Sequence, residues 1–279
     1  MSNVMQFKAK IKNLAINHHI PAQAVLQNFM LERLLERISI SKYQDRIVLK
    51  GGMLIASMVG ISSRTTMDMD ATLRNFPLTE ETIRAAFQDI CAIPIDDEVN
   101  LTIDQVAPIR EEDEYGGFRI ALIARYESIN TPLKIDITTG DIITPEAVRY
   151  AFPSAFEDKR IEVWTYPIET ILAEKIETIL RRSVLNTRPR DFYDVYILIK
   201  TQIRVINKDI FRAAVDATAR KRMSLEALQN RDSIIHTIQE NAVMRQRWER
   251  YCKEYYYASG IGFDEVINTL VDLLSNVSV

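Results

Sequence analysis

Two of the chain's eight glycines stand next to each other, as Gly51 and Gly52, directly after a short apolar run at residues 46–50. Residues 51–59 have the spacing of an amphipathic helix, so the pair falls at a strand-to-helix junction. Glycine lets the backbone approach a ligand closely, and N–H groups at a helix N-terminus favour anions. The pair therefore predicts a phosphate cradle, although a Gly-Gly taken alone is equally typical of a tight turn that binds nothing.

Two aspartates stand one residue apart, as Asp68 and Asp70, in a second apolar run at residues 67–73. In a strand, both carboxylates lie on one face about 7 Å apart and can reach a shared pair of metal ions. Asp136, which is flanked by isoleucines in another predicted strand, is the candidate third ligand, because like charges in a sheet need a cation between them. The alternative is that all three face solvent on half-exposed strands; the upstream glycines favour the metal site.

The composition restricts the remaining chemistry. The chain has 279 residues, of which 47% are hydrophobic, enough for one large or two modest domains. Two cysteines and three histidines, widely scattered, argue against a disulfide framework, a zinc site or a histidine-based triad. Any chemistry must therefore depend on carboxylates, lysines and arginines, and the net charge of -3 argues against a DNA-coating protein while allowing a local basic patch.

The sequence also predicts the cellular location of the protein. No run approaches the roughly 18 apolar residues that cross a bilayer, and residues 1–11 lack the apolar core of a signal peptide. We therefore expect a cytoplasmic protein that makes no membrane contact.

Apolar periodicity predicts a first part that mixes helices with strands. Two helices are expected within residues 6–40, separated before Pro21, and another, after the one at residues 51–59, at residues 79–91 with Thr79 and Thr82 available as caps. The expected strands cover residues 46–50, 67–73, 99–109, 118–126 and 133–138, with a turn at 111–117.

The character of the chain changes after Gly140. Three prolines, at positions 145, 153 and 167, predict a loop-rich passage. The remaining periodic segments predict helices at residues 168–183, 191–200, 207–218, 231–240, 244–257 and 263–275. We place a boundary near Tyr166 and expect two domains, residues 1–166 and 167–279.

Four further residues are candidates for substrate contact. Arg64 and Thr65 lead into the aspartate strand, where they could orient phosphates or the acceptor, or form an ordinary surface loop. Lys175 interrupts the apolar stripe of its helix, which indicates either a phosphate contact or a structural ion pair with Glu177 or Asp191. Asp191 could equally cap the helix that follows it. Asp191 is flanked by a basic run that consists of Arg181, Arg182, Arg188 and Arg190. Such a run is typical of a solvated face, yet an RNA backbone could approach this one.

Five motifs together resemble the AbiEii/AbiGii nucleotidyltransferase-type toxins of the DNA polymerase beta-like nucleotidyltransferase superfamily. They are Lys50-Gly51-Gly52, Arg64-Thr65-Thr66-Met67-Asp68-Met69-Asp70, Lys134-Ile135-Asp136, Glu174-Lys175 and Arg190-Asp191-Phe192-Tyr193-Asp194. The resemblance extends from the N-terminal helices to about Ile199. It implies an α+β, bilobed protein in which a mixed-sheet nucleotidyltransferase lobe and a helical C-terminal lobe frame a cleft. It further implies a toxin paired with an antitoxin, a role in phage defence, and in some members transfer to the tRNA acceptor end.

The resemblance and the motifs together imply roles for the site residues. Two Mg²⁺ ions would be held by Asp68 and Asp70, with Asp136 as the third ligand, and the nucleotide would be bound by Gly51, Gly52, Arg64, Thr65 and Lys175. Asp191 would orient Lys175 or the nucleotide. The superfamily's usual glycine-serine is glycine-glycine here, so phosphate binding must depend on backbone N–H groups and on basic side chains.

The expected reaction is transfer of a nucleotide from an NTP to an RNA acceptor, with the tRNA 3′ end as the main candidate. A first alternative is nucleotidylation of a protein or a small molecule by the same metal site. A second is a catalytically silent module that binds a nucleotide or an antitoxin. The three retained carboxylates favour an enzyme.

Overall fold

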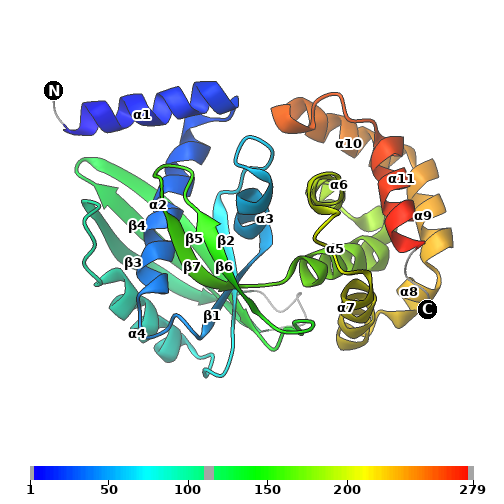
Figure 1. Ribbon diagram of the computed structural model, residues 1–279, viewed down its shortest axis with the longest axis horizontal. Helices are drawn as coiled ribbons and strands as arrows, with labels where there is room; N and C mark the ends of the chain where they lie inside the picture. Colours follow the sequence, from blue (N-terminus) through cyan, green and yellow to red (C-terminus); the bar gives the residue numbers. More distant parts are fainter. Residues whose placement is uncertain (1–2, 110–115, 276–279) are drawn as a thin grey trace. The chain divides into compact units, whose positions relative to one another are not determined.

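The computed structural model describes residues 3–109 and 116–275 (Figure 1). The chain divides into two compact units. The first, here the sheet unit, comprises the residues up to Asp141 together with Val148–Thr165; the second, the helical unit, comprises Ile142–Ala147 and the residues from Tyr166 onward. The expected α+β fold, a mixed sheet followed by a helical part, is confirmed.

In the described residues the sheet unit contains one sheet of seven strands, in the order β3-β4-β5-β2-β1-β7-β6. The sheet is mixed, because β1 pairs in parallel with β7 and β2 with β5, whereas the other neighbours are antiparallel. The strands are β1 (Ile47–Lys50), β2 (Asp68–Leu73), β3 (Val99–Pro108), β4 (Gly117–Tyr126), β5 (Ile129–Thr139), β6 (Val148–Pro153) and β7 (Arg160–Thr165). All the predicted strands are confirmed with small changes at their ends, whereas the turn predicted at residues 111–117 falls mainly outside the described residues.

The prediction of a loop-rich passage after Gly140 was wrong, because β6 and β7 form a hairpin there. Proline lacks the N–H that a central strand must donate, but an edge strand tolerates it. Pro153 is the last residue of β6, which lies at the edge of the sheet, and Pro167 precedes the first helix of the helical unit. Pro153 and Pro167 thus mark the ends of elements, whereas all three prolines had been interpreted as signs of a loop-rich passage.

The helices of the sheet unit agree with the prediction. They are α1 (Asn3–His18), α2 (Ala22–Ser39), α3 (Gly51–Val59) and α4 (Glu80–Cys91). Pro21 precedes α2 as expected, and Thr79 and Thr82 form a reciprocal capping box at the start of α4. α2 packs against β5 and β7, and α4 against β3 (Figure 1).

Alternation along the central strands separates an apolar face of the sheet from a polar one. Met69 and Ala71 of β2, and Ile135 and Ile137 of β5, are fully buried. The intervening residues of the same strands carry carboxylates and are only partly buried. The local sequence pattern therefore directs the candidate site to the polar face.

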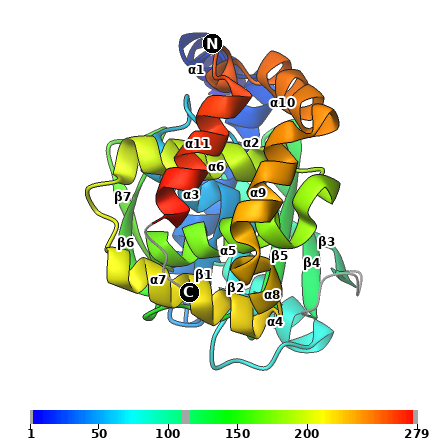
Figure 2. The ribbon, with the colours of Figure 1, turned by 90° about the vertical axis from the view of Figure 1, so that its right-hand side faces the viewer.

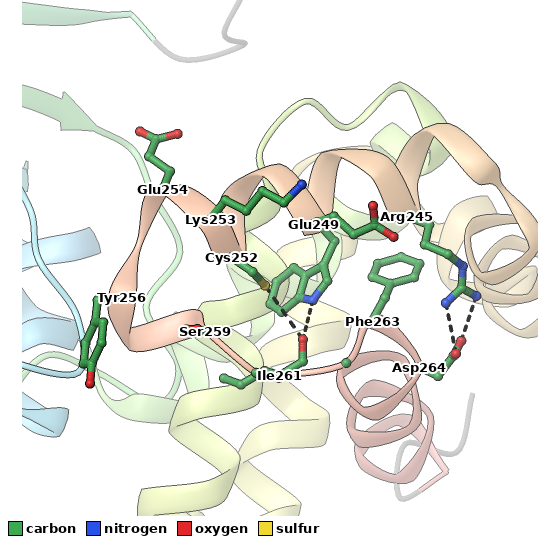
Figure 3. A pocket seen from close by; sticks show the side chains of 13 residues that line it. Arg245, Glu249, Cys252, Lys253, Glu254, Tyr256, Ser259, Ile261, Phe263 and Asp264 are labelled. Atoms are coloured by element: carbon green, nitrogen blue, oxygen red, sulfur yellow. Dashed lines mark hydrogen bonds and ion pairs between the residues drawn. The ribbon is translucent and has the colours of Figure 1, made fainter.

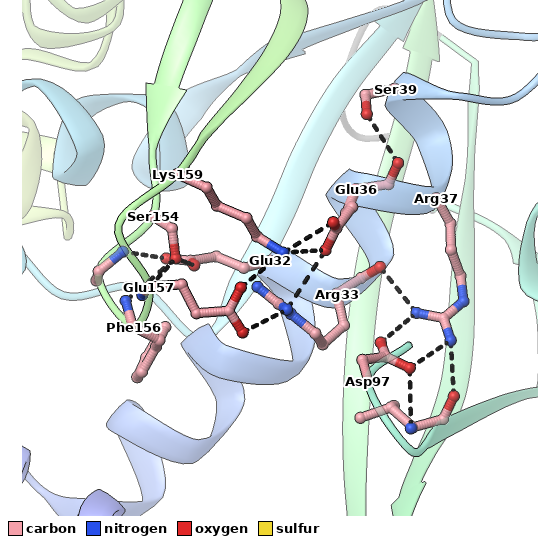
Figure 4. Close-up of polar contacts among 12 residues, drawn as sticks. Glu32, Arg33, Glu36, Arg37, Ser39, Asp97, Ser154, Phe156, Glu157 and Lys159 are labelled. Carbon is pink, nitrogen blue, oxygen red and sulfur yellow. Dashed lines mark hydrogen bonds and ion pairs between the residues drawn. The ribbon is translucent and has the colours of Figure 1, made fainter. Parts of the chain in front are cut away.

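A buried polar cluster ties α2 to the loop between β6 and β7 (Figure 4). The Glu32 carboxylate accepts hydrogen bonds from the Ser154 hydroxyl at 2.6 Å and the Ala155 N–H at 3.0 Å, and Arg33 donates to Glu157 at 2.9 Å. Burial, partly offset by the hydrogen bonds from Ser154 and Ala155, raises the pKa of Glu32 to about 7. The Glu32 carboxyl therefore holds this loop on α2, and burial makes its ionisation in the folded protein unfavourable.

The described part of the helical unit consists of helices linked by short turns (Figure 2). Its helices are α5 (Ile168–Arg182), α6 (Pro189–Gln202), α7 (Lys208–Lys221), α8 (Leu225–Gln229), α9 (Arg231–Glu240), α10 (Ala242–Glu254) and α11 (Phe263–Leu274), with 3₁₀ turns η1 (Ser183–Leu185) and η2 (Tyr256–Ala258). α5 packs against α6 and α7, and α11 against α6 and α9. The predicted helices are confirmed, except that α10 ends at Glu254 instead of Tyr257 and that α8, too short to show a period, was missed. Within the described residues, no helix has the length and apolar character needed to cross a bilayer.

The three tyrosines after α10 are divided between packing and the surface. The rings of Tyr255 and Tyr257 pack on Tyr251, with centroid separations of 4.7 and 6.3 Å. Tyr256 is exposed and lines a surface pocket of about 730 Å³ beside α10 (Figure 3). The pocket lining mixes acidic, basic and aromatic side chains.

Candidate active site

A row of four charged residues crosses the polar face of the sheet. Asp70 on β2 lies in register with Lys50 on one side and with Asp136 on the other, and Asp136 lies in register with Arg119 of β4. Asp68 is two residues from Asp70, on the same face. The structure therefore places the three carboxylates singled out in the sequence on one face of two neighbouring strands, because the parallel pairing of β2 with β5 aligns Asp70 with Asp136.

The glycine pair forms the turn from β1 into α3, directly against this row. Gly51 has φ +68°, and a Cβ added there would lie 2.2 Å from Oδ2 of Asp70. A Cβ on Gly52 would lie 2.8 Å from the Thr66 hydroxyl and 3.2 Å from the Arg64 guanidinium. Gly51 thus allows a close approach of the α3 N-terminus to Asp70, and Gly52 allows one to Thr66 and Arg64.

The segment before β2 is buried, so the surface-loop interpretation of Arg64 and Thr65 was wrong. Arg64, Thr65 and Thr66 are each less than 10% exposed. The Asn28 side chain on α2 donates to the Thr66 carbonyl at 2.8 Å, the Arg64 guanidinium donates to the Thr65 carbonyl, and the Thr66 hydroxyl donates to Oδ1 of Asp68 at 2.7 Å. The segment therefore fixes the orientation of Asp68 and places Arg64 beside the glycine turn.

Arg119, which the sequence analysis did not single out, binds Asp136 through both ends of its guanidinium. The Nε–Oδ1 and NH2–Oδ2 distances are 2.8 and 2.7 Å. The hydrogen bonds to Asp136 raise the pKa of the Arg119 guanidinium, desolvation lowers it, and the charges of Asp136, Asp68 and Asp70 raise it further. Alternation with the buried Ile120 and Leu122 could have placed Arg119 on the polar face, but its partner depends on the register of β4 with β5.

Lys50 is also held by partners that the sequence analysis missed. Its ammonium donates to the Thr138 hydroxyl at 2.8 Å and to the Asp141 carboxylate, which in turn accepts from Thr138 at 2.9 Å. Both Lys50 and Asp141 have largely buried side chains. This contact joins the end of β5 to the residue that precedes the glycine turn.

Lys175 and Asp191 lie in the helical unit, where they form an ion pair. The Lys175 ammonium lies 2.7 Å from Asp191 and 2.9 Å from Asp194, and both carboxylates are buried. The ion-pair interpretation with Asp191 is confirmed, whereas the alternative partner Glu177 instead binds Arg181 and Arg222.

Two further details concern these helices. α6 begins at Pro189 with Arg188 as its N-cap, so the interpretation of Asp191 as the cap was wrong. Asp191 lies in the first turn instead, and its Oδ2 is buried with no hydrogen-bond partner among the described residues. Arg188 and Arg190 of the basic run are exposed.

The donor set of the row was tested against a divalent cation. Carboxylate oxygens are the ligands that Mg²⁺ prefers, and such sites in enzymes of phosphate chemistry use one or two carboxylates together with substrate phosphates. Asp68 and Asp70 supply two carboxylates beside a turn that admits no side chain. As the side chains lie, no group of three aspartate, glutamate, histidine or cysteine residues in the described chain is gathered around one metal position, and Asp136 is bound by Arg119. Asp68 and Asp70 have the oxygen-donor chemistry that suits Mg²⁺, and Asp136 lies in register with Asp70 on the neighbouring strand.

A family model matches most of the chain. The sequence model of the nucleotidyl transferase AbiEii toxins, of type IV toxin–antitoxin systems, matches residues 33–269. No curated protein sequence matches the chain.

Solved structures were compared as well. A candidate nucleotidyltransferase from H. pylori is 14% identical, with coverage of 92% of this chain and 95% of that chain and a TM-score of 0.49. JHP933 from Helicobacter pylori is 15% identical, with coverages of 91% and 90% and a TM-score of 0.48. An antigenic nucleotidyltransferase-like protein from Paracoccidioides brasiliensis is 14% identical, with coverages of 70% and 91% and a TM-score of 0.36.

The family match covers most of the chain, including the glycine turn, the aspartate row and the Lys175 ion pair, and it defines the class as a nucleotidyltransferase. The chain belongs to the AbiEii toxin family of type IV toxin–antitoxin systems.

Proposed function

We propose that this toxin transfers a nucleotide from an NTP to the 3′ end of an RNA, in the first place a tRNA, in a Mg²⁺-dependent reaction. The observation that carries the proposal is the contact between the glycine turn and Asp70, in register with Asp136. Phosphoryl and nucleotidyl transfer depend mainly on positioning and on neutralising negative charge. The arrangement would position the reactants, and the metal that its carboxylates would hold would neutralise the charge.

The carboxylates Asp68 and Asp70 would hold the metal, with Asp136 available as a third ligand. When bound, two Mg²⁺ ions would neutralise the triphosphate and lower the pKa of the acceptor hydroxyl. Asp68 is preoriented for this by the Thr66 hydroxyl. Asp136 would then also accept the proton of the acceptor.

The nucleotide would be bound by the N–H groups at the start of α3 and by neighbouring cations. α3 begins at Gly51, so its first N–H groups would be the donors to phosphate oxygens, and the buried Arg64 lies beside Gly52. Thr65 holds Arg64 through its carbonyl. Lys175, which pairs with Asp191 in the helical unit, stays a predicted contact for the departing pyrophosphate.

A cluster of arginines on the same face of the sheet favours a polyanionic acceptor over a small molecule. Trp164 on β7 lies in register with Val48, which is two residues before Lys50. The guanidinium groups of Arg74 and Arg149 lie over the Trp164 ring, 4.1 and 4.5 Å from the ring centroid. Asp45 accepts from both Trp164 and Arg149. Because Asp45 can neutralise only one cation, the cluster retains positive charge for an RNA backbone.

The direct test is incubation with each α-labelled NTP and total cellular RNA, followed by gel electrophoresis. Label in the tRNA band is expected; label in protein bands would instead favour nucleotidylation of a protein. Asp68→Asn and Asp70→Asn should each abolish transfer without unfolding the protein. Asp104→Asn is the matched control, because Asp104 is an exposed aspartate at a bulge of the same sheet. Full activity of either site variant would refute the metal assignment.

A catalytically silent module is distinguished by calorimetry. Such a module would release heat on binding Mg-NTP but would release no pyrophosphate. A cognate antitoxin is the expected protein partner, since the family belongs to type IV toxin–antitoxin systems. A cytoplasmic location and a role in phage defence stay predictions.

A further inference from the structure

The ion pair between Arg119 and Asp136 lies inside the row that would bind the metal. Its planar guanidinium contacts both oxygens of the Asp136 carboxylate, at 2.8 and 2.7 Å. A bidentate pair of this kind uses the oxygens that a divalent cation would also use. Arg119 and a metal ion therefore compete for the same carboxylate.

Charge explains why a cation is needed here. Asp68, Asp70 and Asp136 share one face, and their mutual repulsion opposes folding unless a positive charge lies among them. Lys50, the other cation of the row, hydrogen-bonds to Thr138 and Asp141. Lys134 lies on the same face in register with Asp68, and Arg119 contacts Asp136 directly.

Exposure allows the pair to open. The Arg119 side chain is 45% exposed and that of Asp136 is 19% exposed. A guanidinium that leaves Asp136 can therefore be solvated without unfolding any element, whereas the carboxylate stays fixed by β5. The pair thus joins a half-exposed guanidinium to a less exposed carboxylate.

We propose that Arg119 is a resident counter-ion that occupies Asp136 when no metal is bound and is exchanged for a divalent cation as the site loads. This rests on the proposed function, because it takes Asp136 as the third metal ligand. After exchange, the released guanidinium lies at the edge of the site, where it is available to an anionic substrate.

The test is calorimetric titration with Mn²⁺ alone, a probe for the Mg²⁺ site, on the full-length chain. Removing the competing charge with Arg119→Gln should tighten Mn²⁺ binding about tenfold, since a neighbouring cation at short range is lost but is partly screened by solvent. Arg119→Lys, which keeps the charge and loses the two-pronged contact, should fall between Arg119→Gln and the wild type. Arg125→Gln is the matched control, because Arg125 is an exposed arginine on the same strand and should leave the affinity unchanged.

A second readout is thermal unfolding with and without Mn²⁺. Without metal, Arg119→Gln leaves the carboxylates without this counter-ion, so the increase in Tm on adding Mn²⁺ should exceed that of the wild type. An unchanged or weaker Mn²⁺ affinity in Arg119→Gln overturns the exchange.

Asp70→Asn separates this failure from failure of the proposed function. If the wild type binds Mn²⁺, Asp70→Asn does not, and Arg119→Gln equals the wild type, the exchange is refuted and the metal site stands. If neither the wild type nor Arg119→Gln binds Mn²⁺, both are refuted. If Arg119→Gln binds Mn²⁺ and the wild type does not, the exchange is supported, because Arg119 then blocks the metal site completely.

Discussion

Replacing Gly51 by alanine tests whether the glycine turn is built around Asp70. The added Cβ would lie 2.2 Å from Oδ2 of Asp70, which is 1.2 Å short of the 3.4 Å at which ordinary contact begins. Either the carboxylate or the turn must move by about that distance. A misplacement of about 1 Å in a catalytic group can cost on the order of 100-fold in rate, so we expect a loss of about this size in nucleotide transfer.

A second glycine isolates the contact from backbone strain. Gly140 has φ +77°, close to the +68° of Gly51, but nothing lies within 4 Å of a Cβ added there. Alanine in this left-handed conformation costs about 1 kcal/mol of stability at either position. Gly140→Ala should therefore lose as much stability as backbone strain alone costs in Gly51→Ala. Its activity should stay within about threefold of the wild type.

The assays are pyrophosphate release under saturating NTP and urea denaturation of both variants. A ratio of activities near one hundred between Gly140→Ala and Gly51→Ala supports the contact with Asp70. Equal activities at equal loss of stability would show that only backbone strain matters, and would refute the reasoning.

Three further predictions concern stability. Since the pKa of Glu32 rises from 4.5 in the unfolded chain to about 7 in the folded protein, its contribution is present below pH 4.5 and is lost as the pH rises through 7. The free energy of unfolding of Glu32→Gln minus that of the wild type, measured by urea denaturation, should therefore increase by about 3 kcal/mol between about pH 4.5 and about pH 8. If this difference does not change with pH, the argument that burial raises the pKa of Glu32 is contradicted. Lys175→Met leaves Asp191 and Asp194 buried without their cation and should cost about 3 to 5 kcal/mol, measured by thermal unfolding; a loss below about 1 kcal/mol would mean that the acids are solvated. Thr79→Ala removes one half of the α4 capping box and should cost about 1 kcal/mol in the same assay, with no effect on transfer.

The secondary structure of the site was predictable because its signals are local. A period of two along residues 67–73 and 133–138 separates carboxylates from buried residues, and the glycine pair marks the start of a helix. α3 runs from Gly51 to Val59 as predicted. Where a local signal was ambiguous the prediction failed, as with the prolines that lie at the end of β6 and before α5.

The partners of the site residues were not predictable in the same way. Arg119 and Asp141 are ordinary charged residues in the sequence, and each acquires its role from a residue on another strand or beyond a strand end. Asp194 follows the predicted Asp191 closely in sequence, but only the packing of α5 against α6 brings it to Lys175.

The sequence by itself determined which residues share a face, because side-chain direction in a strand or helix follows from the backbone period. It also determined the Gly51-Gly52 turn, since a left-handed conformation and a close approach favour glycine. Only the tertiary structure decided that β2 lies between β1 and β5, which sets Asp70 beside Asp136 and Asp136 beside Arg119. Strand order and register depend on burying the apolar faces of segments far apart in the chain, and no local pattern specifies which segments will meet.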